Sequence, residues 1–312
     1  MKKINILITG QLKNKKNLLK TLYKFRNLDF IDQIIISTWT EEVNNNKFLF
    51  SILNKLKVDV VSQKSDVYKN SFFYQSKSLE NGLANISNKN LDVFKTRTDL
   101  FIDTSYLKKI IDLDYSLNNK SIFSKKVWIP FFEISKPFYF GDECIYANYK
   151  DFSKLYNYEE KYDHWQIGPG CSHIRRFIDP YINFYQELEI IQRKHSVTNH
   201  GSSKRFPTLN KLLLDKEYLN FLFFNYLILK NEFRVGLENT ESYIFFREWS
   251  SGKVQPRESE FYKSFDKKNS FNPSLGQIFS YDETWLTNII NNSDFSEEII
   301  NNKIYKQYQS TF

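Results

Sequence analysis

The residues of this sequence that are best suited to chemistry are Lys95, Arg97 and Asp99, which directly follow the largely apolar segment 91–94. A guanidinium binds phosphate through paired hydrogen bonds, and a carboxylate holds a divalent cation through its oxygens. The carboxyl end of a strand in an α/β domain opens into the ligand crevice, so we expect these charged groups to meet a ligand. The alternative is that Arg97 and Asp99 form only an ion pair that closes the strand.

Small and polar residues follow the first apolar segment, 4–8. Thr9, Gly10 and Gln11 stand where this predicted strand gives way to a loop. Because glycine has no side chain, a nucleobase or a ribose can approach the backbone closely there. We therefore assign these three residues to nucleotide binding.

A second strand end carries Ser37, Thr38 and Trp39, after the apolar run 34–36. The carboxyl ends of parallel strands meet at one edge of a sheet, so these residues can line the same crevice. Trp39 can stack on a base, but large aromatic side chains are mostly buried, and we expect it to pack in the core.

A helix is predicted over about residues 70–86. Within it, Gln75, Ser78 and Gly82 fall at positions i, i+3 and i+7 and form a stripe of polar and small residues beside an apolar stripe. Such a stripe allows either the close approach of a ligand or close packing of the helix against the sheet. The sequence leaves both interpretations open.

Asp142 and Glu143 are candidate bases for deprotonating an acceptor hydroxyl. They follow the segment 138–141, which predicts a strand that meets a glycine, so we expect them at an edge rather than inside a helix. A turn or capping role is the alternative for Asp142.

His164 precedes a Gly-Pro-Gly loop at 168–170 and is a further candidate base or metal ligand, although a loop histidine is more often simply solvated. The basic segment 193–205 can close over a diphosphate or serve as a linker.

Strand and helix patterns alternate along the first half of the chain. Helices with the apolar faces Leu18-Leu22-Phe25 and Phe48-Ile52-Leu56 separate apolar strands at 4–8, 34–36 and 58–61. This alternation predicts an α/β fold with a Rossmann-type, mostly parallel sheet and helices on both faces. We expect a nucleotide-sugar-binding part at 1–157, and an acceptor-side part at 158–312 that is largely helical with a strand at 242–246, with the two parts forming one continuous unit.

Four short motifs, in this order, resemble the WavE lipopolysaccharide-synthesis family: Ile8-Thr9-Gly10-Gln11-Leu12, Ser37-Thr38-Trp39, the segment from Gln75 to Leu83, and the segment from Lys95 to Asp99. That family is similar to GT-A glycosyltransferases of bacterial surface polysaccharides. The resemblance covers about the first hundred residues and continues more weakly to about residue 156. It implies a GT-A-like fold and the transfer of a sugar from a nucleotide-sugar donor to a lipopolysaccharide, lipooligosaccharide or capsular polysaccharide acceptor.

The resemblance also implies a donor site, composed of Thr9, Gly10, Gln11, Ser37, Thr38, Gln75, Ser78, Gly82, Lys95, Arg97 and Asp99, and it aligns Asp142 with an acid of the family. A GT-A enzyme usually binds Mg²⁺ or Mn²⁺ through an Asp-x-Asp element. Here the element reads Arg97-Thr98-Asp99. A guanidinium replaces one carboxylate, so Asp99 is a lone metal ligand or binds the donor sugar, while Arg97 and Lys95 neutralise the diphosphate. The metal requirement stays open.

Composition restricts the remaining classes. The net charge is +8, but the lysines are scattered and no RNA-binding or zinc-finger signature is present, so we expect no nucleic-acid partner. Two cysteines, Cys144 and Cys171, are too few for a disulfide-stapled fold. No apolar run matches a signal-peptide core or a spanning helix. We expect a cytoplasmic protein, and peripheral association with the inner face of the inner membrane stays open for a lipid-linked acceptor.

Two alternative functions use the same observations. A sugar-phosphate or phosphoryl transferase of capsule synthesis would need the same nucleotide site. A noncatalytic protein that binds nucleic acid or a membrane surface would use the positive charge and the 29 Phe and 20 Tyr residues. The ordered strand-end motifs favour a transferase, because a pure binding protein has no need of charged groups that face a crevice.

Overall fold

The computed structural model describes residues 2–12, 15–65, 71–117, 121–130, 132–133, 139–156, 186, 215–237, 245–247, 271–272 and 277–278. The chain forms two compact units and passes between them more than once. Unit 1 comprises Met1–Tyr115, Asp142–Glu160 and Thr240–Ser264, and unit 2 comprises Ser116–Gly141, Lys161–Asn239 and Phe265–Phe312. His164, Cys171 and the basic segment 193–205 lie outside the described part.

Unit 1 is built on five strands in the spatial order β9-β4-β1-β2-β3. These are β1 (Ile4–Thr9), β2 (Ile31–Trp39), β3 (Asp59–Gln63), β4 (Asp92–Arg97) and β9 (Ile145–Asn148). The strands β1, β2, β3 and β4 run parallel to one another, and β9 runs antiparallel to β4. The predicted mostly parallel sheet is therefore confirmed.

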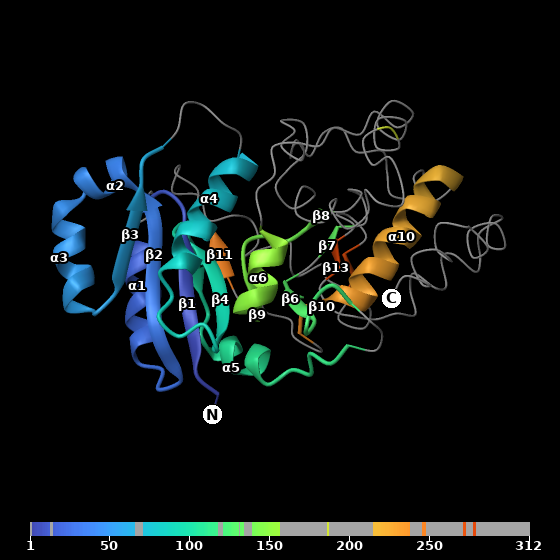
Figure 1. Ribbon diagram of the computed structural model, residues 1–312, viewed down its shortest axis with the longest axis horizontal. Coiled ribbons are helices and arrows are strands. Elements are labelled where there is room, and N and C mark those ends of the chain that lie inside the picture. Colours follow the sequence, from blue (N-terminus) through green and yellow to red (C-terminus); the bar gives the residue numbers. More distant parts are fainter. Residues whose placement is uncertain are drawn as a thin grey trace. The chain divides into compact units, whose positions relative to one another are not determined.

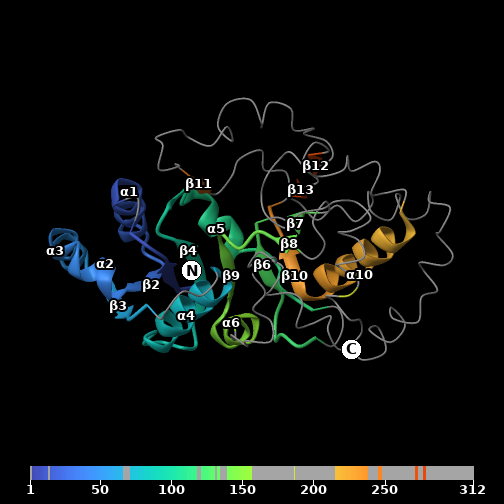
Figure 2. The ribbon, with the colours of Figure 1, turned by 90° about the horizontal axis from the view of Figure 1, so that it is seen from above.

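The helices of unit 1 lie on both faces of this sheet, as the sequence predicts. They are α1 (Lys15–Arg26), α2 (Thr40–Asn44), α3 (Lys47–Lys55), α4 (Ser71–Ala84), α5 (Ser105–Ile111) and α6 (Tyr149–Leu155). Figure 2 shows α1 on one face and α4 with α6 on the other. Helix α4 packs against β1, β2 and β3, and Figure 1 shows it in front of the sheet. The two connections β1-α1-β2 and β3-α4-β4 thus cover opposite faces, which makes the sheet doubly wound.

Burial explains why these segments form these elements. Every residue of β1 is buried, which is typical of a central parallel strand that is covered on both faces. Helix α4 buries Phe72, Leu79 and Leu83. In α3 the expected apolar face is wrong, because Leu49 and Leu53 are buried whereas Phe48 is 82% exposed. Two apolar stripes run side by side on this helix, and the one turned toward the edge strand β3 is the one that packs.

Shorter strands complete the described part. In unit 1, β5 (Leu100–Ile102) pairs antiparallel with β11 (Phe245–Arg247), which overlaps the strand predicted at 242–246. In unit 2, β6 (Val127–Ile129) pairs parallel with β10 (Phe233–Val235). Unit 2 also contains helix α10 (Lys216–Glu232) and a small antiparallel sheet of β12 (Phe271–Asn272), β13 (Gln277–Ile278), β7 (Phe132–Glu133) and β8 (Tyr139–Phe140).

No helix in the described part of the chain combines the length and the apolar character that crossing a membrane requires.

Candidate functional site

The strand order of unit 1 creates a topological switch point beside β1. Strands β2 and β3 are added on one side of β1, and the chain then returns to place β4 on the other side. Ligands of open α/β sheets bind outside the carboxyl ends of the strands at such a point. The register brings the predicted residues together there, because Thr9 is paired with Ser37 of β2 and with Arg97 of β4.

The loop after β1 is fixed by hydrogen bonds from both neighbouring strands. Gly10 has a φ of +119°, a backbone conformation that favours glycine, and its N–H donates to the Ser37 carbonyl at 3.2 Å. The Thr38 hydroxyl donates to the Gly10 carbonyl at 2.9 Å, and the Thr98 hydroxyl donates to the Gln11 carbonyl. Thr38 and Thr98 therefore hold the loop in place rather than face the crevice.

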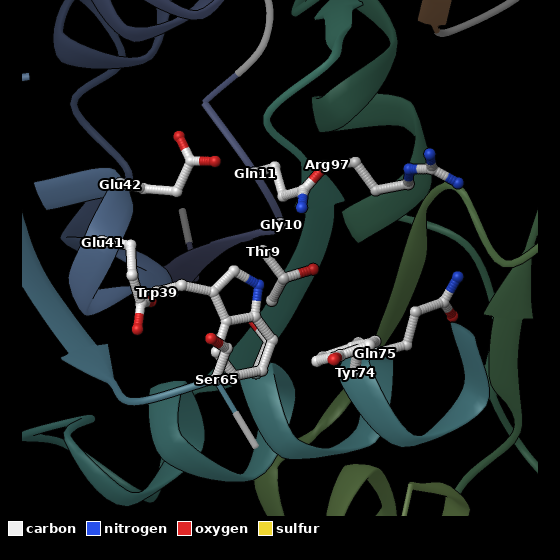
Figure 3. A pocket seen from close by; sticks show the side chains of 11 residues that line it. Thr9, Gly10, Gln11, Trp39, Glu41, Glu42, Ser65, Tyr74, Gln75 and Arg97 are labelled. Atoms are coloured by element: carbon white, nitrogen blue, oxygen red, sulfur yellow. The ribbon is translucent and has the colours of Figure 1, made fainter. Parts of the chain in front are cut away.

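A cavity of about 540 Å³ opens at this edge of the sheet. Its volume falls within the range of small-ligand sites. The lining residues come from the ends of β1, β2 and β4, from the segment after β3, and from the helices α2 and α4. They are Thr9, Gly10, Gln11, Trp39, Glu41, Glu42, Ser65, Tyr74, Gln75, Ser78 and Arg97 (Figure 3). Six of the predicted donor-site residues thus line one cavity.

Arg97 supplies the positive charge of this cavity. Its Nε and Nη2 each donate to one oxygen of Asp99 at 2.9 Å, so the pair is bidentate. Burial by itself lowers the pKa of Arg97, but the carboxylates of Asp99 and Asp142 outweigh this effect and raise it. The guanidinium is therefore held charged and oriented, and its other N–H groups are left for a ligand. The expected ion pair exists, and it leaves Arg97 on the cavity wall.

Polar and aromatic side chains of α4 form the opposite wall. Gln75 Oε1 is buried and has no hydrogen-bond partner among the described residues, although it belongs to a cavity-lining side chain. The Ser78 hydroxyl donates to the Ser37 carbonyl at 2.9 Å. The rings of Trp39 and Tyr74 meet edge to face, with centroids 5.1 Å apart. Trp39 is buried, as predicted, yet it also lines the cavity.

Behind Arg97 lies a second group, which we call the buried polar cluster: Lys95, Asp142, Glu143, Cys144 and Tyr156. Lys95 is only 1% exposed, and its Nζ donates to the Asp142 carbonyl. Burial lowers the pKa of Lys95, and the charge of Asp142 partly offsets this. Burial also raises the pKa of Tyr156, and the charge of Asp142 adds to this effect.

The acids of this cluster follow β8 in a segment that is neither helix nor strand, consistent with the predicted edge position, but they face inward. Asp142 is 5% and Glu143 is 9% exposed, and neither lines the cavity. Asp142 Oδ2 is buried and accepts no hydrogen bond from any described residue. The cluster therefore places negative charge behind Arg97, where a ligand in the cavity does not reach it.

Gly82 has a packing role. A Cβ at this position would lie 2.4 Å from Leu7 Cδ1 and 3.1 Å from Ser37 Cβ. Glycine thus lets α4 approach β1 and β2 closely, which is one of the two interpretations that the sequence left open. Ser37 is likewise fully buried, and neither residue lines the cavity.

Sequence reasoning missed Glu41, Glu42, Ser65 and Tyr74 as cavity-lining residues. The signal for the two glutamates was present, because they follow the strand end Ser37-Thr38-Trp39 after one residue and lie in the first turn of the helix α2. Tyr74 directly precedes Gln75 and had no comparable signal.

The contacts of Asp99 leave it poorly suited to bind a metal ion. Both of its carboxylate oxygens accept hydrogen bonds from Arg97. Among the residues that the structure describes, no three His, Cys, Asp or Glu side chains are grouped as metal ligands. These residues therefore do not by themselves form an Mg²⁺ or Mn²⁺ site.

No family model matches the chain, so membership of the WavE family is not confirmed, and no curated protein matches its sequence.

Similar solved structures include three transferases or synthases. One is 4-diphosphocytidyl-2C-methyl-D-erythritol synthase from Anaerococcus prevotii, with 15% identity and a TM-score of 0.38 over 56% of this chain and 84% of that chain. The galactosyltransferase LgtC has 9% identity and a TM-score of 0.36 over 55% and 69%. S. aureus TarS (residues 1–349) has 12% identity and a TM-score of 0.36 over 71% and 72%. Likeness at these TM-scores is too low to assign a function, so the function has to be inferred from the residues of the cavity.

Proposed function

We propose that this chain is a glycosyltransferase that moves a sugar from a nucleotide-sugar donor to a lipopolysaccharide, lipooligosaccharide or capsular polysaccharide acceptor. One observation carries the donor half of the proposal: a charged, oriented Arg97 faces a cavity of nucleotide size at the topological switch point. The acceptor half rests on the resemblance of the four motifs to the WavE family.

In this proposal Arg97 binds the donor diphosphate. A guanidinium binds phosphate oxygens through paired hydrogen bonds, and Asp99 keeps its plane fixed. Thr9, Gly10 and Gln11 provide the floor on which the nucleotide rests, and the buried Gln75 Oε1 accepts a hydrogen bond from a donor hydroxyl. A nucleotide sugar thus offers a diphosphate to the positive charge of Arg97 and a hydroxyl to the unpaired Gln75 Oε1.

The reaction breaks the bond between the donor's anomeric carbon and the diphosphate oxygen and forms a bond from that carbon to an acceptor oxygen. Negative charge grows on the leaving diphosphate, and Arg97 stabilises it. The acceptor proton passes to a base, for which Asp142, Glu143 and His164 remain the predicted groups. Because Asp142 and Glu143 are buried in the structure, we propose for them an additional role. Their carboxylates stabilise the positively charged forms of Lys95 and Arg97.

We further propose that the enzyme acts in the cytoplasm, with peripheral contact to the inner face of the inner membrane where a lipid-linked acceptor is presented.

In the proposed reaction, Mn²⁺ or Mg²⁺ would be recruited together with the diphosphate. The oxygens of the diphosphate would supply ligands that the chain lacks at Asp99.

Calorimetric titration tests the proposal directly. The purified chain is titrated with UDP, GDP, CDP, ADP, their sugar conjugates and inorganic pyrophosphate, each with and without Mn²⁺. We expect one nucleoside diphosphate and its sugar conjugate to bind, because binding to the native state requires the complementary charge of Arg97. If no nucleotide binds, while RNA or anionic vesicles do in a salt-sensitive manner, the proposal is wrong and the noncatalytic alternative replaces it.

The nature of the transferred group needs a separate measurement. The mass of the product formed on a purified acceptor glycan distinguishes transfer of a sugar from transfer of a sugar phosphate, since only the second adds phosphorus.

A further inference from the structure

The cavity has opposite charges at its two ends. Glu41 and Glu42 of α2 lie on one side, and Arg97 lies on the other (Figure 3). Glu42 is fixed in this position, because its Oε2 accepts a hydrogen bond from the Leu12 N–H at 3.3 Å. Neither carboxylate has an ion pair with any residue that the structure describes. No described cation therefore neutralises the glutamate end of the cavity.

This charge pattern orients a nucleotide. Phosphate oxygens are repelled by carboxylates and attracted by the guanidinium, so the diphosphate lies at the Arg97 end. The uncharged nucleoside then lies at the glutamate end. Trp39 and Tyr74 also line the cavity, and their edge-to-face pair provides an aromatic surface for a base.

The chemistry of the two glutamates restricts which base fits. An ionised carboxylate only accepts hydrogen bonds. Guanine presents adjacent N–H groups, at N1 and at the 2-amino group, on one edge, and a carboxylate can accept from both. Uracil presents a single N–H between two carbonyl oxygens. If this N–H donated to a carboxylate, the carbonyl oxygens of uracil would lie against the carboxylate oxygens. Cytosine and adenine present one amino group beside an acceptor nitrogen.

We infer that Glu41 and Glu42 select a guanine nucleotide as the donor, with its base against Trp39 and its diphosphate at Arg97. This inference rests on the proposed function. A site built to accept hydrogen bonds from a ligand discriminates strongly against a ligand that lacks the donor groups. The two glutamates are thus specificity-determining residues of the donor site.

The test compares base preference with diphosphate affinity in the same variants. GDP, UDP, CDP, ADP and pyrophosphate are titrated into the unmodified protein, the double variant Glu41→Gln/Glu42→Gln, and the control Glu80→Gln, which removes a negative charge from α4 outside the cavity. We expect GDP to bind about 100-fold more tightly than UDP. In the double variant this ratio falls to about tenfold or less, while pyrophosphate affinity does not fall. The control keeps the ratio.

Two results would overturn the inference and leave the proposed function standing: UDP, CDP or ADP binds more tightly than GDP, or the preference for GDP survives in the double variant. Failure of every nucleotide to bind would instead remove the proposed function and the inference with it. Thermal unfolding is measured for each variant. If the double variant does not fold, Glu41→Gln and Glu42→Gln are titrated separately, and retention of the full GDP preference in both contradicts the inference.

Discussion

The cavity and the buried polar cluster both lie at the carboxyl end of β4, and they use charge in opposite ways. In the cavity, Arg97 lines the wall and has N–H groups that its bonds to Asp99 do not use, and Gln75 keeps an unpaired oxygen. In the cluster, Lys95 is enclosed and bonded to the Asp142 carbonyl. Lys95 and Arg97 are two positions apart on one strand, so residue type alone does not separate a group that lines the cavity from one that bonds a loop carbonyl. The two groups differ instead in their depth below the sheet edge, because Arg97 lines the cavity and Lys95 is buried beneath it.

Replacement of Arg97 should have the largest effect on binding. The variant Arg97→Met removes the groups that we propose to bind the diphosphate, so we expect the affinity for the preferred nucleoside diphosphate to fall about 100-fold or more. Arg97→Lys should recover only part of the loss, because an ammonium cannot form the bidentate contact. Lys3→Met, which removes a charge from a surface ion pair, serves as the control and should bind normally. Unchanged nucleotide affinity in a folded Arg97→Met protein would contradict the proposed donor site.

Replacement of Lys95 should instead affect stability. In Lys95→Met the buried carboxylates of Asp142 and Glu143 lose their nearby positive charge, and we expect the free energy of unfolding to fall by about 3 kcal/mol in urea titrations. Adding Asp142→Asn to this variant removes one uncompensated charge and should restore part of the loss.

The same variant tests whether Lys95 is a donor-binding residue, as the sequence predicts. A Lys95→Met protein that is as stable as the unmodified one but loses nucleotide affinity to the same extent as Arg97→Met would place Lys95 in direct contact with the ligand. The difference between cavity and cluster would then disappear.

The smallest expected effect is a change in stability at high pH, and it concerns Cys144. Burial raises the pKa of its thiol to about 12 from an ordinary value of 9.0. Between these values the unfolded chain has lost the thiol proton and the folded chain has kept it, so the unfolded state binds fewer protons and stability falls as pH rises. In a Cys171→Ser background, urea titrations between pH 8 and pH 11 should show a steeper decline than the same titrations with Cys144→Ala added.

Thiol labelling gives an independent check on this burial. In the same background, a thiol reagent should modify the urea-unfolded protein rapidly and the native protein slowly, since Cys144 is fully buried. Equal rates would mean that the buried polar cluster opens to solvent and is not an enclosed region.

The sequence alone determined the class of the fold and which strand ends meet at one edge of the sheet. Periodicity located the strands and helices of unit 1, because a central parallel strand such as β1 is apolar throughout and a covering helix repeats its apolar residues every 3.6 positions. The short motifs at the strand ends and on the helix 70–86 then predicted residues that meet at one edge, and Thr9, Gln75 and Arg97 do line one cavity.

The tertiary structure decided which of these side chains face the cavity. Thr38 and Lys95 are polar residues at strand ends, like Thr9 and Arg97, but the Thr38 hydroxyl holds the Gly10 loop and Lys95 lies beneath the edge. Glu41 and Glu42 reach the cavity only because α2 folds back over the end of β2. A sequence motif specifies what a side chain can do chemically, whereas its distance from the sheet edge and its hydrogen-bond partners, which depend on segments far away in the chain, determine whether a ligand can reach it.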